Sequence, residues 1–266
     1  MSIHKKIPKS SGIALKKRYG QHFLREERIV QRIVDYIDIT DASVMEIGCG
    51  DGFLTRKIVE MPIARLWVFE IDESWAELVR STVKDERLSI FIENILDIDA
   101  HKLEEHAPWV LLANLPYQIT FPILFLIQRN RELFREGVIM VQEEVAQKIL
   151  KKHGRNYGLA SLFFQYYFEW KMLDKIPPSA FYPPPKVNSR LLYFKPKKDL
   201  VPIPEEEKFW KFIKVSFRQP RRTLRNNLMQ YHCDFSSIPD TILSLRAQQM
   251  TFDQLLELWE KIRHCV

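Results

Sequence analysis

The sequence predicts an α/β domain followed by a smaller all-helical domain. Short apolar runs typical of buried strands alternate with segments of helical periodicity over most of the chain. Beyond a polar, proline-containing linker at 195–204, only helical patterns remain. We therefore expect an open α/β sheet in a domain at 19–198 and a helical domain at 199–266, preceded by a flexible basic arm at 1–18.

Each predicted element rests on a local pattern. Apolar residues at helical spacing, such as Ile29 and Ile33, indicate the first helix, and the run from Trp109 to Ala113 indicates a buried strand. Strands are expected at 43–47, 66–72, 88–93, 109–113, 137–142, 168–173 and 190–195. Helices are expected at 25–36, 74–84, 121–128, 143–152, 158–165 and 253–263. One more helix is expected to begin at Pro220, because proline suits a first helical turn.

The composition excludes several classes of protein. An apolar share of 46% is normal for a globular protein, and no apolar run approaches the roughly 20 residues of a membrane-spanning helix. The first residues lack the apolar stretch of a signal peptide, so we expect a cytoplasmic protein. The three cysteines, Cys49, Cys233 and Cys265, are far apart and have no metal-ligand spacing, which predicts reduced thiols and no metal site.

Positive charge is concentrated in two stretches. The first 18 residues hold six lysine and arginine residues and no acid, which equals the whole formal net charge of +6. A basic arm of this kind suits a polyphosphate partner. The second stretch, 208–233, also has no acid and includes Arg218, Arg221, Arg222 and Arg225. The alternative is a solvated surface without a partner or, in the helical domain, pairing with acids of the same domain.

Four predicted strands end in glycine or polar residues. The first is followed by a glycine-rich turn at 48–52, the second ends in Glu70, and the third leads into Asn94. Because parallel strands bring their carboxyl ends to one edge of the sheet, we expect these residues to converge on one crevice. Glu70 lies about twenty residues beyond the turn, the offset of an acid that binds ribose hydroxyls. The alternatives are a turn without a ligand and helix capping, which Asp72 suits better than Glu70 and which Asp51 also suits.

The fourth strand is followed by Asn114-Leu115-Pro116-Tyr117, where we place the chemistry. Asparagine offers a carbonyl acceptor, proline stiffens the turn and tyrosine offers an aromatic face. These groups suit a planar base that carries an exocyclic amine. The alternative is a plain turn between strand and helix, in which asparagine and proline are common.

A loop at 177–189 holds five prolines and two adjacent aromatic residues, Phe181 and Tyr182. Aromatic side chains on a stiff loop are suited to stacking on a nucleobase. We therefore expect Phe181 to contact the target base. The alternative is that Phe181 packs into the core.

These motifs together resemble the ribosomal RNA adenine N6,N6-dimethyltransferase family, specifically the bacterial enzymes that act on 16S rRNA. The resemblance covers nearly the whole chain. It is carried by the segments at 17–21, 46–50, 114–117, 178–189 and 221–228.

The resemblance implies a Rossmann-like S-adenosylmethionine-dependent methyltransferase domain with a small all-α C-terminal domain. It implies dimethylation of N6 on two adjacent adenines near the 3′ end of 16S rRNA, in the small ribosomal subunit or its precursor, during ribosome biogenesis. The implied cofactor-binding residues are Gln21, His22, Leu24, Gly48, Gly50, Glu70, Ile71, Asn94, Ile95 and Asn114. The residues implied at the methyl-transfer site are Asn114, Leu115, Pro116, Tyr117 and Phe181. The implied RNA-binding residues are Lys17, Arg18, Arg218, Arg221, Arg222 and Arg225.

The chain departs from the family pattern at three positions. His22 stands where the family usually has asparagine, and Asn94 stands where it usually has aspartate, so Asp97 is a candidate to compensate. Pro220 replaces the first of the usual basic residues before Arg221. None of the three removes a group that the chemistry requires.

Two alternative functions are compatible with the same fold. One is the 23S rRNA adenine dimethyltransferase of the macrolide-resistance type, which lacks the segment at 221–228. The other is a catalytically weak ribosome-assembly factor, which the departures at His22 and Asn94 would allow.

Overall fold

The computed structural model describes residues 9–10, 12–16, 20–231 and 233–266. Lys17, Arg18 and most of the predicted basic arm lie outside the described residues. The chain divides into two compact units, the first formed by 1–146 and 169–196, the second by 147–168 and 197–266. The split after 196 falls in the predicted linker. The segment 147–168 belongs to the second unit, although its sequence pattern predicts that it lies in the first domain.

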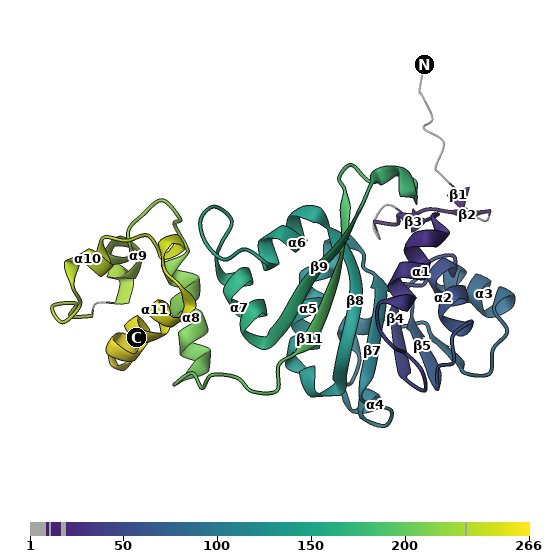
Figure 1. The fold of residues 1–266 in the computed structure, drawn as a ribbon, viewed down its shortest axis with the longest axis horizontal. Coiled ribbons are helices and arrows are strands. Elements are labelled where there is room, and N and C mark those ends of the chain that lie inside the picture. Colours follow the sequence, from purple (N-terminus) through teal and green to yellow (C-terminus); the bar gives the residue numbers. More distant parts are fainter. Residues whose placement is uncertain (1–8, 11, 17–19, 232) are drawn as a thin grey trace, which may run out of the picture. The chain divides into compact units, whose positions relative to one another are not determined.

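The first unit is built on a seven-stranded sheet with the strand order β6-β5-β4-β7-β8-β11-β9 (Figure 1). Its strands are β4 (Ser43–Ile47), β5 (Arg65–Phe69), β6 (Leu88–Phe91), β7 (Trp109–Asn114), β8 (Phe134–Gln142), β9 (Phe168–Ile176) and β11 (Ser189–Pro196). The strands from β6 to β8 run parallel, and β11 pairs antiparallel with β8. The predicted α/β fold is therefore confirmed.

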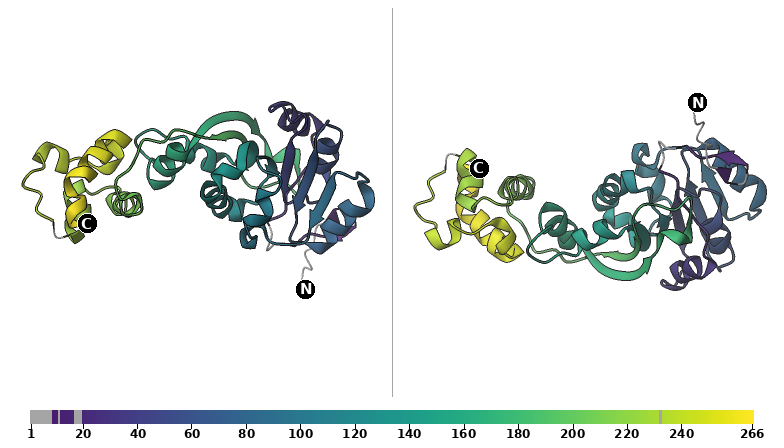
Figure 2. Two further views of the ribbon diagram at one scale, coloured as in Figure 1. Left: turned by 90° about the horizontal axis from the view of Figure 1, so that it is seen from below. Right: turned by 90° about the horizontal axis from the view of Figure 1, so that it is seen from above.

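Helices lie on both sides of this sheet (Figure 2). They are α1 (Glu27–Asp35), α2 (Phe53–Val59), α3 (Glu73–Thr82), α4 (His101–Glu104), α5 (Thr120–Arg129) and the first half of α6 (Glu143–Ile149). Side chains of α1, α2 and α3 form one core with alternate strand residues such as Val44, Val110 and Val138. The intervening strand residues, such as Leu111, are also fully buried, because successive side chains of a strand point to opposite faces.

The strand order has a switch point between β4 and β7. The chain first proceeds from β4 outward to β5 and β6, and then returns to β7 on the other side of β4. Open α/β sheets bind their ligands in the crevice that such a reversal creates at the carboxyl ends of the strands. The glycine turn after Ile47 and the segment after Asn114 both lie at this point.

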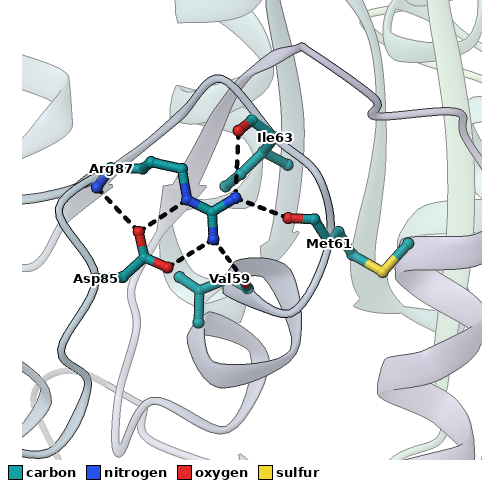
Figure 3. A network of polar contacts seen from close by, with 5 residues as sticks. All are labelled: Val59, Met61, Ile63, Asp85 and Arg87. Atoms are coloured by element: carbon teal, nitrogen blue, oxygen red, sulfur yellow. Dashed lines mark hydrogen bonds and ion pairs between the residues drawn. The ribbon is translucent and has the colours of Figure 1, made fainter.

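At the amino-terminal ends of β5 and β6, away from the cavity side, Arg87 stabilises the loops that lead into these two strands (Figure 3). Its guanidinium donates to the carbonyls of Val59 (2.6 Å), Met61 (2.9 Å) and Ile63 (3.3 Å). It also pairs with both carboxylate oxygens of Asp85. This arginine therefore connects the loop after α2 to the turn before β6, away from the crevice.

Two pairs of short antiparallel strands form small sheets of their own outside the seven-stranded sheet. β1 (Lys9–Ser10) pairs with β2 (Ile13–Ala14), and β3 (Phe23–Leu24) pairs with β10 (Phe181–Tyr182). The second pair brings the proline-rich loop against the segment that precedes α1. This pairing decides where Phe181 lies, as described below.

The second unit contains the end of α6 and the helices that follow it; α8 to α11 are green to yellow in Figures 1 and 2. Its helices are α7 (Leu159–Tyr167), α8 (Glu206–Ser216), α9 (Leu224–Leu228), α10 (Asp240–Leu243) and α11 (Phe252–Ile262). Phe209, Phe212 and Trp259 are fully buried and form its aromatic core. No helix in the described part of the chain is long and apolar enough to cross a membrane.

Two local predictions for this unit are wrong. Pro220 lies in a turn rather than at a helix start, because Thr223 caps α9 by accepting from the backbone amide of Asn226. Cys233 and Cys265 form a disulfide with Cα atoms 5.6 Å apart, so only Cys49 is the free thiol that the sequence predicts. The turn following α11 brings Cys265 beside a residue that is distant in sequence, which cysteine spacing does not reveal.

Candidate active site

A cavity of about 320 Å³ opens at the carboxyl ends of β4, β5, β6 and β7. Its lining comes from 20–24, the loop after β4, the ends of β5 and β6, and 114–119. The lining includes the ten residues predicted to bind a cofactor: Gln21, His22, Leu24, Gly48, Gly50, Glu70, Ile71, Asn94, Ile95 and Asn114. Leu115, Pro116 and Tyr117 line it as well. The four strand ends thus converge on one crevice as predicted, and the segment 20–24, which only the family resemblance pointed to, lines the same cavity.

The glycine loop has a backbone that other residues would not adopt easily. Gly48 and Gly50 have φ angles of +76° and +53°. A Cβ atom on Gly50 would stand 2.4 Å from the Phe23 ring, which packs directly on the loop. The prediction that Asp51 caps α2 is wrong, because Gly52 is the N-cap and Asp51 pairs with Arg25 (2.6 Å).

Glu70 is held in place at the floor of the cavity. One carboxylate oxygen accepts from the backbone amide of Gly50 (3.1 Å) and the other from that of Asp72 (2.9 Å). Its side chain is buried, and the loss of hydration raises the pKa of this carboxyl group. The capping role falls to Asp72 instead, which accepts from the backbone amide of Ser74 at the start of α3.

Glu46 is a lining residue that the sequence reasoning missed. It lies in β4, is 1% exposed and accepts a hydrogen bond from the Thr55 hydroxyl (2.7 Å). Burial, with a smaller contribution from the negative charge of Glu70, raises the pKa of Glu46 to about 8. A charged residue inside an otherwise apolar strand is the sequence signal that would have revealed it.

The cavity has a marked excess of carboxylates. Among the described residues that line it, four are acidic (Glu46, Asp51, Glu70 and Glu93) and none is lysine or arginine. The acids at its edges have partners outside the lining, since Glu93 pairs with Lys102 as Asp51 does with Arg25. The raised pKa of Glu46 keeps that group mostly protonated near pH 7, so Glu70 is the acid of the described lining that has neither a cationic partner nor a pKa as high as about 8. With no lysine or arginine in the described lining, its charge favours a ligand with a positive group over a phosphate-bearing cofactor.

Asn94 is fixed by its own turn. Its side-chain oxygen accepts from the backbone amide of Leu96 (3.2 Å), and its side-chain nitrogen donates to Asp97 (2.8 Å). In the described lining, Asn94, Ile95 and Leu96 contribute but Asp97 does not. Asp97 therefore contacts Asn94 and does not itself line the cavity.

The segment before β3 is attached to the N-terminus of α3. Lys16 pairs with the buried carboxylate of Asp72 (2.8 Å), and Gln21 donates to the other oxygen of Asp72 (3.4 Å). Gln21 also accepts from the backbone amide of Lys16 (2.8 Å). These contacts hold Gln21 and His22 at the mouth of the cavity.

The Asn114 side chain has a defined orientation. Its nitrogen donates to the backbone carbonyl of His22 (3.2 Å), which leaves its oxygen as an acceptor. The backbone amide of Leu115 donates to the carbonyl of Met140 in β8 (3.1 Å). The tetrapeptide is therefore attached both to the sheet and to the segment that covers the cavity.

Two further contacts fix the aromatic residue of the tetrapeptide. The ring of Tyr117 stacks on that of His22, with centroids 5.8 Å apart, and its hydroxyl is hydrogen-bonded to Ser189 (2.6 Å). A ring nitrogen of His22 is hydrogen-bonded to the carbonyl of Pro183 (2.7 Å). The proline-rich loop thus supports Tyr117 from two directions.

The expectation that Phe181 contacts the target base is wrong. Its side chain is 4% exposed and packs with Leu24, Ala180 and other residues of the core. Pairing of Phe181 with Leu24 turns the ring inward, whereas the next residue, Tyr182, is 45% exposed.

The predicted RNA-binding residues of the helical domain lie around the start of α9. Arg221 and Arg222 are exposed and pair with no acid among the described residues. Arg218 donates to Gln230 (3.3 Å), and Arg225 forms an ion pair with Asp240. Arg225 is therefore the arginine of this group that pairs with an acid of its own domain, as the alternative to RNA binding predicts.

The sequence model of a family described as "Ribosomal RNA adenine dimethylase" matches residues 12–258. The chain belongs to this family. Two relatives of the dimethylase are both named "Ribosomal RNA small subunit methyltransferase A". The one from Chlorobium phaeobacteroides is 34% identical over 257 residues, covering 96% of this chain and 94% of the relative. The one from Thermotoga petrophila is 36% identical over 262 residues, covering 97% and 95%.

Solved structures share the fold of this dimethylase. A dimethyladenosine transferase from Plasmodium falciparum superposes with a TM-score of 0.77 at 20% identity, covering 92% of this chain and 98% of the other. The 23S rRNA methyltransferase ErmE superposes with a TM-score of 0.66 at 19% identity, covering 88% and 98%. At such identities the likeness concerns the fold alone.

Proposed function

We propose that this dimethylase transfers methyl groups from S-adenosylmethionine to N6 of two adjacent adenines near the 3′ end of 16S rRNA. The substrate is the small ribosomal subunit or its precursor, and the reaction belongs to ribosome biogenesis. The observation that carries the proposal is the position of Asn114-Leu115-Pro116-Tyr117 at the edge of a carboxylate-lined cavity. The names of the relatives, which cover nearly the whole chain, support the small subunit as the substrate.

The residues of the cavity fit S-adenosylmethionine, which supplies a methyl group on a positively charged sulfur. Acidic lining without lysine or arginine suits a cation. Glu70 offers a carboxylate of fixed orientation for the ribose hydroxyls. Ile71 is 48% exposed and lines the cavity, so it offers an apolar surface for the adenine ring. We assign the adenine amine to the turn at Asn94 and Ile95.

The methyl-transfer step depends on the orientation of Asn114. The exocyclic nitrogen of adenine is a weak nucleophile, because its lone pair is delocalised into the ring. We infer that the Asn114 side-chain oxygen and the Leu115 carbonyl accept the two amine hydrogens in the first transfer, which favours a pyramidal nitrogen. In the second transfer the monomethylated amine has one hydrogen, so one of these acceptors binds it. After each transfer the methylated nitrogen releases one proton, which passes from these acceptors to water. Alignment of a reactive donor and acceptor supplies a large part of the rate enhancement in such a reaction, so a strong base is not needed.

The target base is held by stacking. Tyr117 is fixed by His22 and Ser189, and it presents a ring at the edge of the cavity. Burial raises the pKa of its hydroxyl, so the ring stays neutral at working pH. An adenine must be unpaired or flipped out to reach it.

Phosphate contacts are assigned to the helical domain and the basic arm. Arg218, Arg221 and Arg222 are exposed, and Arg225 is paired with an exposed aspartate, a weak surface interaction that a phosphate can replace. Such contacts fix the position of RNA without reading its bases.

The experiment must distinguish this function from the two alternatives, a 23S rRNA dimethyltransferase and a catalytically weak assembly factor. Purified protein should be incubated with labelled S-adenosylmethionine and unmethylated 30S or 50S particles. Label on two adjacent adenines of 16S rRNA is the expected result. Label on 23S rRNA would favour the macrolide-resistance type, and no label with either particle would favour the assembly factor.

A further inference from the structure

A second cavity, of about 310 Å³, lies entirely within the helical second unit. Its volume is at the lower end of the range that small ligands occupy. Aromatic side chains line it together with Lys152 and Lys197. We propose that this cavity binds one unpaired nucleotide of the RNA substrate, separately from the adenine that is methylated.

Tyr157 provides the first indication of a ligand. Its side chain is only 5% exposed, lines the cavity and stacks edge-on against Phe217. Its hydroxyl forms no hydrogen bond with any described residue, and burial raises its pKa to about 12. The hydroxyl oxygen is not among the fully buried atoms that lack a partner, so it is accessible although the side chain is mostly buried, and the side chain lines the cavity. The hydroxyl is therefore a group that a base or ribose in the cavity would satisfy.

The walls of the cavity are fixed by contacts of their own. The Tyr166 hydroxyl donates to the carbonyl of Val201 (2.7 Å), and its ring stacks on Phe252 with centroids 5.4 Å apart. The Gln165 amide nitrogen donates to the carbonyls of Ile149 and Lys151, both at 2.7 Å. The loop that carries Lys152 is thus held in position, and the aromatic wall does not need to form on binding.

The charge around the cavity suits a phosphate. The second unit holds 16 lysine and arginine residues against 9 acidic residues, whereas the net charge of the whole chain is only +6. The segment 147–168 contributes four of these cations and no acid. Lys152 is exposed and pairs with no acid among the described residues, and Lys197 is held by the carbonyl of Gln165 (2.8 Å).

Aromatic walls, a free hydroxyl and a cation at one edge are the combination that binds single-stranded RNA. Asp199 and Thr251, which also line the cavity, offer oxygen acceptors for the amine of a base. The candidate active site differs, because its described lining has four acids and no lysine or arginine, whereas this cavity is lined by two lysines and one acid. The two cavities therefore suit different parts of one reaction complex. The RNA assignment rests on the proposed function, whereas the nucleotide chemistry rests on the cavity itself.

The test uses the full chain and short single-stranded oligoribonucleotides, with binding followed by calorimetry. Lys152→Gln and Tyr157→Phe should each weaken binding roughly 3- to 10-fold, the loss expected for one hydrogen bond. Lys151→Gln is the matched control, because this neighbouring lysine is exposed and does not line the cavity. It should change binding by less than about 2-fold, as expected for a screened surface charge. Tyr157→Phe should leave the melting temperature unchanged, because the hydroxyl has no partner in the described fold.

The outcomes separate this proposal from the proposed function. Unchanged binding in both cavity variants, or equal losses in Lys152→Gln and Lys151→Gln, would overturn the nucleotide site even if the wild type methylates 16S rRNA. Inorganic phosphate or AMP bound as tightly as an oligonucleotide would overturn the RNA assignment. If the wild type methylates neither particle but the cavity variants still lose oligonucleotide affinity, the nucleotide site stands and the proposed function fails.

Discussion

The side-chain nitrogen of Asn114 donates to the backbone carbonyl of His22, across 92 residues of sequence. This contact joins the end of β7 to the segment that covers the cavity. It also orients the Asn114 side chain, whose oxygen has no partner among the described residues and can therefore accept a hydrogen bond from a ligand. His22 in turn stacks on Tyr117, so one contact orients both the acceptor and the aromatic ring.

The first prediction concerns Asn114→Ala. It should lower methyl transfer by two or more orders of magnitude while cofactor affinity stays nearly normal, because the amide oxygen acts on the target amine in the transition state. Single-turnover kinetics and calorimetry measure the two effects. Asn114→Asp is the companion variant: it keeps an oxygen but cannot donate to His22, so it should also be impaired. Near-normal turnover in Asn114→Ala would remove this residue from the mechanism.

The second prediction concerns Glu70. Replacement by alanine should weaken cofactor binding by roughly 1–3 kcal/mol, as expected for the loss of charge-assisted hydrogen bonds. Binding of RNA in the absence of cofactor should hardly change. Because Glu70 also accepts from Gly50 and Asp72, thermal melting must accompany the calorimetry. Glu70→Gln keeps acceptor capacity and should lose less affinity than Glu70→Ala. Unaltered cofactor affinity in both variants would overturn the ribose assignment.

The third prediction concerns the pH dependence of stability. The pKa of Glu46 is raised from an ordinary 4.5 to about 8, so between these values the folded chain binds a proton that the unfolded chain has released. The stabilisation that this bound proton gives the folded chain is complete below about pH 4.5 and is lost as the pH rises through about 8. The slope is at most about 1.4 kcal/mol per pH unit.

Glu46→Gln replaces the titrating carboxyl group with a neutral amide but keeps an acceptor for the Thr55 hydroxyl. The variant should therefore gain stability relative to the wild type as the pH rises from 5 to 8. Urea unfolding at several pH values in this window measures the difference. A difference that does not vary with pH would show that Glu46 has the same protonation state in the folded and unfolded chains.

The sheet and the convergence of four strand ends could be predicted because both depend on local patterns: apolar runs define parallel strands, and the ends of such strands meet at one edge. Gln21, His22 and Leu24 line the same cavity, but they precede the sheet and were implied only by the family resemblance. Glu46 could not be predicted from strand ends because it lies inside β4, although a carboxylate within an apolar strand is itself informative.

The wrong predictions depend on contacts between distant segments. Phe181 turns inward because its strand pairs with Leu24, and no property of the proline-rich loop itself reveals that pairing. Asp51 suits a helix cap by residue type, but Arg25 binds it instead. The disulfide of Cys233 with Cys265 depends in the same way on how the helices of the second unit pack.

The last prediction concerns the arginines near α9. Arg221 and Arg222 pair with no acid among the described residues, whereas Arg225 is bound to Asp240, so their contributions to RNA binding should differ. The double variant Arg221→Gln, Arg222→Gln should lower the log–log salt slope of particle binding by about two units. Adding Arg225→Gln should lower it by less than one further unit, because releasing Asp240 offsets part of the phosphate contact. Lys211→Gln is the control, since Lys211 pairs with Glu207 on α8. Cofactor affinity should stay normal in all variants. A slope that stays unchanged while thermal stability falls would show that these arginines serve the fold and not the RNA.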